Sequence, residues 1–502
     1  MKIKLKTPIS LQEFTILINK IPIKNGETFG VAVSGGVDIL ALIIDHKLRE
    51  DSMAESLNVS DTLSKIVSQL ETMARIERYK LLAKLCKENN IKFLFLGHHL
   101  NDQLETMIMR FSRGSGIDGL AGMDITSRFP IIKNYEALDI SIVRPLLSIT
   151  KERLRLTCEN LNLKWFEDPT NKSLNYKRNL IRFHLNNLDR KYNLENKLEF
   201  EPLSTTGLTN FLNHMKYHKI FINSKVDKII KNFVNFDSKN GICILYLSAS
   251  TNHWLTKQHL ATRILNKLIN WVNCSEHNPR LESVLNCYKF ILKISSNIIN
   301  TTNSSTRNSK ENFQSNITIN GVLICQTLFS TKQINKDDKL RSDIHHFVFS
   351  RQPFILKKQQ QEEQKNEIPI KNGEIILWDK RFFIGVKFLS SFSSLEHFFI
   401  RALNKKDLKL IRNQLSLSSK DDYKTYKESF ENYLKKIPPI CRYTIPVLVI
   451  KNNKLKNMKM RSELMTTLKE DKDEVIVGLP SLEINFLKNN LSIWSKFCNA
   501  KE

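Results

Sequence analysis

The chain has 502 residues, which is long for a single hydrophobic core and predicts two to four domains. Hydrophobic residues make up 41% of the chain and include 28 Phe, so an intrinsically disordered protein is excluded. The formal net charge of +26 is spread along the chain and favours a polyanion such as nucleic acid as partner. A basic proteome that prefers Lys, Asn and Ile codons is the alternative source of part of this charge.

The eight cysteines are far apart, and none belongs to a C-x-x-C pair. This spacing argues against a zinc ribbon, an iron–sulfur site and a disulfide framework, and it favours a reducing compartment. No apolar run approaches the ~20 residues that span a bilayer, so we expect a soluble protein without a membrane partner.

The N-terminal segment, residues 1–28, allows two interpretations. It carries three lysines before its first acid, Glu13, and it contains no arginine. It is either an organelle-targeting segment or an ordinary first helix.

Residues 29–184 predict an α/β domain. The expected strands are apolar runs at 29–33, 40–45, 91–99 and 138–146, and helical spacing of apolar residues fills 68–90. A strand, a helix and a strand in this order form a βαβ unit, so we expect a parallel sheet with flanking helices. Ligands of such sheets bind beyond the carboxyl ends of the strands. In this chain the unusual polar residues follow the strands, in "SGGVD", "IDHKLR" and "GHHLND".

The remainder of the chain is expected to divide into three parts. Residues 185–300 look mostly helical, and 301–367 are interpreted as low-complexity insertions because of two polar, Asn-, Ser- and Gln-rich stretches. A small α+β domain is predicted for 368–502, where "GEIILWDKRFFIGVKFL" is typical of a β-hairpin around an Asp-Lys turn.

A glycine turn follows the first predicted strand. Ser34, Gly35 and Gly36 leave the strand through a turn in which the missing Cβ atoms let backbone amides approach an anion. The alternative is a tight strand exit without a ligand.

Two acids open the helix that follows the third predicted strand. A helix starting near Asp102 places Asp102 and Glu105 at i and i+3, on one face, with His98 and His99 just before it. Two carboxylates and an imidazole at the strand ends can hold Mg²⁺ or take a proton from an attacking amine. The alternative is that Asp102 caps the helix and His98 is a satisfied core residue.

Six stretches of the sequence, quoted at the end of this paragraph, occur in an order that resembles a known motif series. The series is that of the tRNA(Ile)-lysidine synthase family, within the N-type ATP pyrophosphatase or PP-loop superfamily, whose domain is a HUP-like Rossmannoid fold. The resemblance covers roughly 29–184, and weaker similarity to the C-terminal part of some members follows in "ILWDKRFFIGV" and "KKIPPICRYTIPVLVI". The stretches that carry it are "SGGVD", "IDHKLRED", "ETMARIERY", "GHHLNDQLETMIMRFSRGSGIDGLAGM", "IVRPLL" and "WFEDPTNKSLNYKRNLIR".

The resemblance implies a ligase that forms a carbon–nitrogen bond. ATP adenylates the wobble cytidine of the isoleucine tRNA with a CAU anticodon and releases pyrophosphate, and the amine of free lysine then displaces AMP. The implied substrates and partners are ATP, Mg²⁺, free lysine and isoleucine tRNA, with a homodimer as a further expectation. Residues 185–300 would form a tRNA-binding or linking region of the chain.

The resemblance also implies roles for individual residues. The ATP loop would consist of Ser34, Gly35, Gly36 and Asp38, and Mg²⁺ would bind at Asp38 and Asp102. The residues implied around the adenylated base and the lysine are Arg78, His98, Asp102 and Glu105, with Arg75 and Arg110 as supports.

Three arginines are candidates for contact with tRNA phosphates. Arg178 and Arg182 lie one helical turn apart in "NYKRNLIRFH", and Arg113 lies in "RGSG". The alternative for each is a solvated basic face.

The sequence departs from the family pattern at two places. The family loop is S-G-G-x-D-S, and its last Ser opens a helix that crosses back to the next parallel strand, whereas here Asp38 is followed by Ile39. A parallel crossover needs a dozen or more residues, and the six from Asp38 to Ile43 are too few. A second apparent deletion lies near Lys65. We therefore predict that ATP binding by this chain is weakened.

Three functions are thus compared. The first is the ligase, the second is a non-catalytic tRNA-binding member of the family, and the third is a related enzyme that transfers sulfur to tRNA. The third is disfavoured because no C-x-x-C pair lies near the loop. Asn-, Lys- and Ser-rich insertions are typical of a eukaryotic protein, and lysidine in a eukaryote implies an organellar tRNA, so we expect a mitochondrial location, with the cytoplasm as the alternative.

Overall fold

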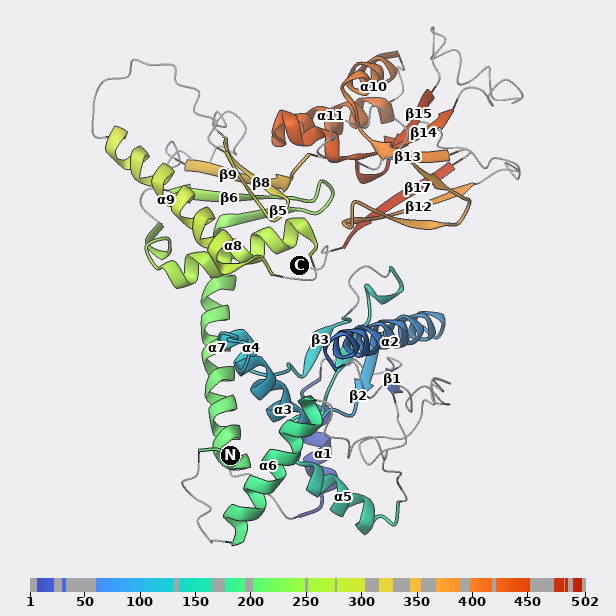
Figure 1. Ribbon diagram of the computed structural model, residues 1–502. Helices are drawn as coiled ribbons and strands as arrows, with labels where there is room; N and C mark the ends of the chain where they lie inside the picture. The colour runs from blue at the N-terminus through green and yellow to red at the C-terminus, as the bar shows by residue number, and fades with distance from the viewer. Residues whose placement is uncertain are drawn as a thin grey trace. The chain divides into compact units, whose positions relative to one another are not determined.

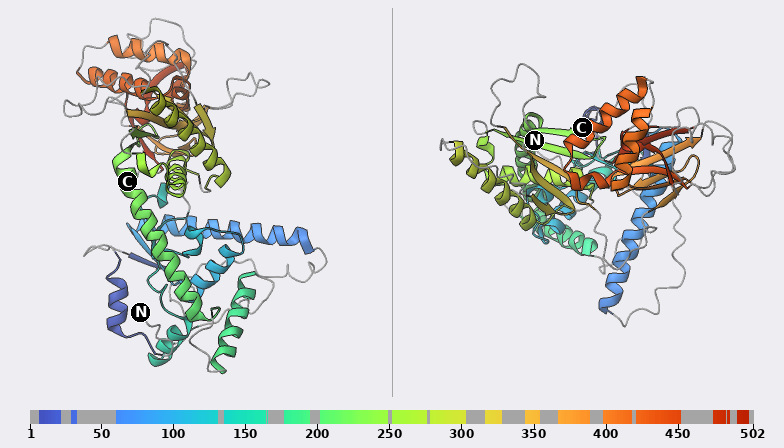
Figure 2. Two further views of the ribbon diagram at one scale, coloured as in Figure 1. Left: turned by 90° about the vertical axis from the view of Figure 1, so that its left-hand side faces the viewer. Right: turned by 90° about the horizontal axis from the view of Figure 1, so that it is seen from above.

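The computed structural model divides into two compact units, residues 1–224 and 225–502, and each is considered by itself (Figures 1 and 2). The boundary falls inside helix α7 (Thr205–Phe233). The structure describes residues 7–21, 29–32, 60–130, 135–163, 165, 177–194, 202–248, 252–275, 278–302, 316–327, 344–353, 367–388, 398–417, 421–451, 474–482, 484–485 and 491–498.

A four-stranded sheet forms the centre of the first unit. Its order is β1-β2-β4-β3, with β1 (Phe29–Ala32), β2 (Phe93–Leu96) and β4 (Ser141–Val143) parallel. The edge strand β3 (Thr126–Arg128) is antiparallel to β4 and was not expected from the sequence. The predicted parallel sheet is therefore confirmed, while the expected strand at 40–45 lies outside the described residues.

Helix α2 (Ser60–Glu88) connects β1 to β2 and covers one face of this sheet. Its Tyr79, Leu82, Ala83 and Cys86 recur at helical spacing and pack against Leu94 of β2. Of the apolar residues at helical spacing that predicted this helix, Met73 and Leu85 are exposed.

The first helix, α1 (Leu11–Ile18), covers the other face. Ile18 and Ile21 pack against Phe95, which alternates with Leu94 along β2. Arg153 of α5 (Lys151–Asn160) donates to both carboxylate oxygens of Glu13, at 2.9 and 2.6 Å. Residues 11–18 are therefore a helix docked on the domain, in agreement with the interpretation as an ordinary first helix.

The other helices of the first unit follow the sheet in sequence. They are α3 (Leu100–Phe111), α4 (Ile117–Leu120), α6 (Lys177–Leu194) and α7, with a 3₁₀ turn at Tyr135–Ala137. No helix in the described part of the chain combines the length and hydrophobicity that crossing a membrane requires.

The second unit begins with an antiparallel five-stranded sheet of order β5-β6-β9-β8-β7. Three of its strands fall within 301–367, so interpreting that whole range as insertions was wrong. The segments 303–315 and 354–366 lie outside the described residues. The elements are β5 (Val234–Asp237), β6 (Ile242–Ser248), α8 (Gln258–Asn273), α9 (Leu281–Thr302), β7 (Asn316–Ile319), β8 (Val322–Thr327) and β9 (Ile344–Arg351).

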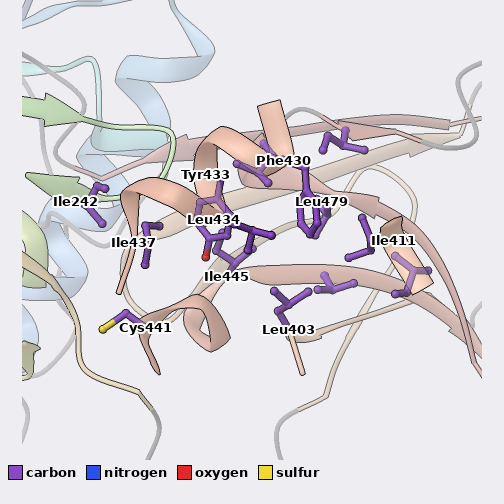
Figure 3. Close-up of a cluster of buried hydrophobic side chains, with 14 of the residues drawn as sticks. Ile242, Leu403, Ile411, Phe430, Tyr433, Leu434, Ile437, Cys441, Ile445 and Leu479 are labelled. Atoms are coloured by element: carbon purple, nitrogen blue, oxygen red, sulfur yellow. The ribbon is translucent and has the colours of Figure 1, made fainter. Parts of the chain in front are cut away.

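The C-terminal part has the α+β content that was predicted. Its hairpin turns at Asp379 and Lys380, whose φ angles of 46° and 58° are those of a type I′ turn. Helices α10 and α11 pack on the sheet β10-β13-β14-β15-β16, and Figure 3 shows Phe430, Tyr433 and Leu479 in this core. The elements are β10 (Ile368–Ile370), β11 (Ile375–Trp378), β12 (Phe382–Phe388), β13 (Phe398–Ala402), α10 (Lys405–Leu417), α11 (Asp421–Lys436), β14 (Pro446–Lys451), β15 (Glu474–Leu479), β16 (Ile484–Asn485) and β17 (Leu491–Phe497).

Candidate active site

The two predicted acids lie at the start of α3, at the carboxyl end of β2. The helix begins at Leu100, as the sequence predicted to within two residues, and His99 is its N-cap. Asp102 Oδ2 accepts a hydrogen bond from the His99 backbone N–H at 3.0 Å. Asp102 therefore does stabilise the helix start, but from the third helical position, which leaves its other oxygen for a further partner.

Two arginines of α6 reach both acids. Arg178 donates from Nε to Glu105 Oε2 at 2.6 Å and from Nη2 to Asp102 Oδ1 at 2.8 Å. Arg182, one turn later, donates from Nε to Glu105 Oε1 at 2.7 Å. The one-turn spacing read from the sequence therefore directs both guanidinium groups to one pair of carboxylates.

Burial makes each charge in this cluster depend on a partner of opposite charge. The Glu105 side chain is 1% exposed and that of Asp102 is 13% exposed, whereas those of Arg178 and Arg182 are 42% and 26% exposed. Two carboxylates and two guanidinium groups balance in charge, and removing one partner would leave a charge that water cannot solvate. The predicted contact of these arginines with tRNA phosphates remains a prediction, because in this structure they bind carboxylates.

The pKa of Asp102 follows from these contacts. Burial alone would raise the pKa of this carboxyl group. The His99 imidazole, the His99 backbone N–H and the Arg178 guanidinium outweigh burial and hold the pKa of Asp102 below its usual value. The group is therefore a carboxylate at neutral pH, and it attracts cations.

His98 differs from a satisfied core histidine. Its Nδ1 is buried and has no hydrogen-bond partner within the described ranges. Burial lowers the pKa of His98 to about 4, and the positive charges of Arg144, Arg178 and Arg75 act in the same direction against the attraction of Asp102. The imidazole is thus neutral at pH 7 and offers a hydrogen-bonding nitrogen to a ligand.

Arg144 is a candidate that the sequence reasoning missed. It follows the last residue of β4, at the same edge of the sheet as His98, and donates from Nη1 to Ser127 Oγ at 2.9 Å. Its Nε is buried without a hydrogen-bond partner among the described residues. A cation near the carboxyl end of an expected strand, in "IVRPLL", is the only signal of it that the sequence offers.

The loop after α3 is fastened by residues of the long central motif. The Gln103 side chain donates to Met123 O at 2.8 Å and accepts from Met123 N–H at 2.6 Å. Arg110 Nη1 donates to Gly122 O at 2.7 Å. Arg110, expected as a support, therefore holds the loop rather than the acids.

The remaining candidates are placed as follows. Arg78 and Arg113 are exposed, on α2 and just beyond α3 respectively, and Arg75 is the α2 residue whose charge acts on His98. Neither exposed arginine is placed in the cluster of Asp102 and Glu105 by a described contact. The ATP-loop residues lie outside the described ranges, namely Ser34, Gly35, Gly36 and Asp38.

Magnesium ligands are not assembled in the part of the chain that is described. No group of three or more His, Cys, Asp or Glu side chains there is arranged to hold a metal ion. Both oxygens of Asp102 accept hydrogen bonds, one from a guanidinium whose charge repels a dication. The described residues alone therefore do not fit Mg²⁺.

Comparison with known proteins adds independent evidence. A family model described as a PP-loop domain matches residues 39–188, a range that contains His98, both acids and both arginines of the cluster. A probable tRNA(Ile)-lysidine synthase of Schizosaccharomyces pombe is 28% identical over 531 residues, covering 96% of this chain and 98% of the relative.

Bacterial relatives match over shorter ranges. The tRNA(Ile)-lysidine synthase of Wolbachia sp. subsp. Brugia malayi is 28% identical over 297 residues, covering 52% of this chain and 64% of the relative. That of Rickettsia akari is 35% identical over 184 residues, covering 30% of this chain and 41% of the relative. The chain therefore contains a PP-loop domain and is similar to tRNA(Ile)-lysidine synthases, to one of them along nearly its whole length.

Proposed function

We propose that this protein is a tRNA(Ile)-lysidine synthase, a ligase that joins free lysine to the wobble cytidine of the isoleucine tRNA with a CAU anticodon. One observation supports the proposal above the others. The buried pair Asp102–Glu105 meets two guanidinium groups at the carboxyl edge of a parallel sheet, beside a neutral His98. Ligands bind at this edge in open α/β sheets.

The first step attaches AMP to the cytidine. The carbonyl oxygen of the base attacks the α-phosphorus of ATP, and pyrophosphate leaves with the electrons of the broken phosphorus–oxygen bond. Negative charge develops on the phosphate oxygens, and Arg144 and Arg75, two of the cations whose charge acts on His98, would stabilise it. The glycine turn at 34–36 would supply backbone amides to the other phosphates.

The second step needs lysine as an uncharged amine. The amine nitrogen attacks the adenylated carbon, AMP leaves with the electrons of the carbon–oxygen bond, and the nitrogen passes one proton to solvent water. Arg178 and Arg182 balance the charges of Asp102 and Glu105, so an entering ammonium meets a site without net negative charge. Burial then lowers the pKa of that ammonium and favours the nucleophilic form.

Two further elements belong to the proposal. ATP would bring Mg²⁺ bound to its phosphates, which neutralises part of their charge. A mitochondrial location is supported only by the Asn- and Lys-rich composition, and imaging of a tagged full-length chain tests it.

Incorporation of labelled lysine into isoleucine tRNA tests the function directly. We expect incorporation that requires ATP and is lost in Asp102→Asn, with pyrophosphate release slowed because Ile39 follows Asp38 where the family loop has its last Ser. Binding of the tRNA without any lysine incorporation would contradict the ligase and support the non-catalytic alternative.

A further inference from the structure

Helix α7 carries an exposed stripe that no step of the proposed reaction uses. Between residues 214 and 228, six exposed residues share a sector roughly 100° wide and ~21 Å long. This α7 stripe consists of His214, Tyr217, His218, Phe221, Lys225 and Lys228.

The stripe is the outward face of a helix whose opposite face is fixed to the active-site helix. Leu208 and Leu212 of α7 are buried against Leu100, Leu104 and Met107 of α3. Lys219 also pairs with Asp124 at 2.8 Å, which holds the helix in one rotation. The packing and the ion pair therefore hold the part of α7 that belongs to the first unit in one rotation.

Two aromatic rings form the centre of the stripe. Tyr217 is 66% exposed and Phe221 is 48% exposed, although large apolar side chains on a packed helix are usually buried. Their ring planes differ by 13° and their centroids are 6.5 Å apart. Two partly exposed and nearly parallel rings suit stacking on planar ligands.

The charged side chains near these rings favour an anionic partner. The part of α7 within the first unit, residues 205–224, contains no Asp or Glu but two lysines and two histidines. One of these lysines, Lys219, is paired with Asp124. On the sector of the stripe the helix continues with Lys225 and Lys228, while Asp227 lies outside the sector and pairs with Lys267 at 2.8 Å. Aromatic rings interleaved with cations and free of acids suit a strand that exposes bases and carries phosphates.

We infer that the α7 stripe binds unpaired bases of the RNA substrate, with Tyr217 and Phe221 stacking on them and Lys225 and Lys228 contacting phosphates. The inference rests on the proposed function, because it takes the RNA to be the substrate tRNA. It assigns RNA recognition to a surface separate from the acids and arginines of the active site.

The test measures the affinity of full-length protein for an isoleucine tRNA transcript by fluorescence anisotropy at several salt concentrations. The double variant with Tyr217→Ala and Phe221→Ala should bind the tRNA about tenfold or more weakly, because stacking is lost. The slope of log affinity against log salt should stay unchanged, because no cation is removed. Lys225→Gln/Lys228→Gln should instead make the slope shallower, by about 0.7 to 0.9 per lost phosphate contact.

Matched variants separate stacking from unfolding. Tyr217→Phe/Phe221→Tyr keeps both rings and should bind as the wild type does. Leu161→Ala removes a 59% exposed apolar side chain outside the stripe and should also bind normally. All variants should keep the wild-type thermal midpoint, since the replaced side chains are exposed.

Two results would overturn the inference without touching the proposed function. One is unchanged tRNA affinity of Tyr217→Ala/Phe221→Ala while the wild type binds tRNA and transfers lysine. The other is conversion of a wild-type dimer to a monomer by this variant, seen by light scattering, with tRNA affinity unchanged, because the stripe would then bind a second copy of the chain. A wild type that binds no tRNA at all would instead refute the proposed function.

Discussion

Arg178 Nε lies 2.6 Å from Glu105 Oε2, and this ion pair joins a side chain that is 42% exposed to one that is 1% exposed. The acid is out of reach of water and depends on arginines from a helix 73 residues away in sequence. The pair therefore fixes α6 against α3, and the geometry of the acids depends on residues of both helices.

The first prediction concerns the charge of Glu105. Glu105→Gln keeps the shape of the side chain but leaves Arg178 and Arg182 without their buried counter-charge. We expect the free energy of unfolding to fall by about 3 kcal/mol, and lysine transfer to be lost. Urea denaturation measures the first effect, and incorporation of labelled lysine measures the second.

A surface pair provides the control for this prediction. Glu77 pairs with Lys80 at 2.6 Å, but both side chains are about half exposed. Glu77→Gln should change the free energy of unfolding by less than ~1 kcal/mol. Equal, small losses in Glu77→Gln and Glu105→Gln would contradict the assignment of Glu105 as a buried, charge-dependent residue.

The second prediction concerns pH. The pKa of His98 is about 4 in the folded protein, against 6.5 when unperturbed, because burial disfavours the imidazolium. Its contribution to stability is complete above pH 6.5 and declines as the pH falls toward 4, because only the unfolded chain gains the proton. Between pH 7 and pH 5 the free energy of unfolding should fall by about 2 kcal/mol on account of His98.

The comparison of wild type with His98→Gln isolates this effect, because the glutamine does not titrate. The titration of Asp102 does not contribute to this difference between pH 7 and pH 5. Its pKa is lowered from 3.8, so its contribution is present above that value and is lost only as the pH falls further. Identical pH dependence in the two proteins between pH 7 and pH 5 would show that His98 is not a buried neutral residue.

The third prediction concerns the first helix. Arg153 is 4% exposed and binds Glu13 through two nitrogens, at 2.9 and 2.6 Å. Glu13→Gln removes the counter-charge, so α1 should detach more readily and the free energy of unfolding should fall by about 2 to 3 kcal/mol. Hydrogen exchange of the α1 amides should accelerate, while α3 amides keep their rates. Unchanged exchange in α1 would show that the ion pair does not hold the helix.

Sequence patterns predicted those features that depend on neighbouring residues. The parallel sheet, the start of α3 and the shared face of Asp102 and Glu105 follow from local periodicity. The hairpin at Asp379 and Lys380 was likewise readable, because two polar residues between alternating apolar runs indicate a turn.

Features that depend on distant pairing were not predictable. The arginines of α6 bind carboxylates 73 to 77 residues away, and their charge alone fitted phosphate equally well. Strands β7, β8 and β9 lie between polar segments, so the composition of the whole range does not indicate strands. They are stabilised by pairing with neighbouring strands, which their own sequence pattern does not show. The charge of Arg144 acts on His98 because β4 pairs with β2, and the sequence near Arg144 does not show this pairing.

The last prediction concerns Gly122, which lies in the loop that Gln103 and Arg110 hold. Its φ is +71°, and a Cβ there would lie 2.3 Å from Gln103 Oε1. Gly122→Ala should therefore lower the free energy of unfolding by about 3 kcal/mol, because an unfavourable backbone angle adds to a clash in a packed site. Gly114→Ala is the matched control, since its φ is +69° but nothing lies within 4 Å of the added Cβ. Gly114→Ala should lower the free energy of unfolding by only about 1 kcal/mol, measured by urea denaturation. Equal losses in the two variants would mean that the Gln103 side chain moves aside at little cost, and that its bonds to Met123 do not hold the loop.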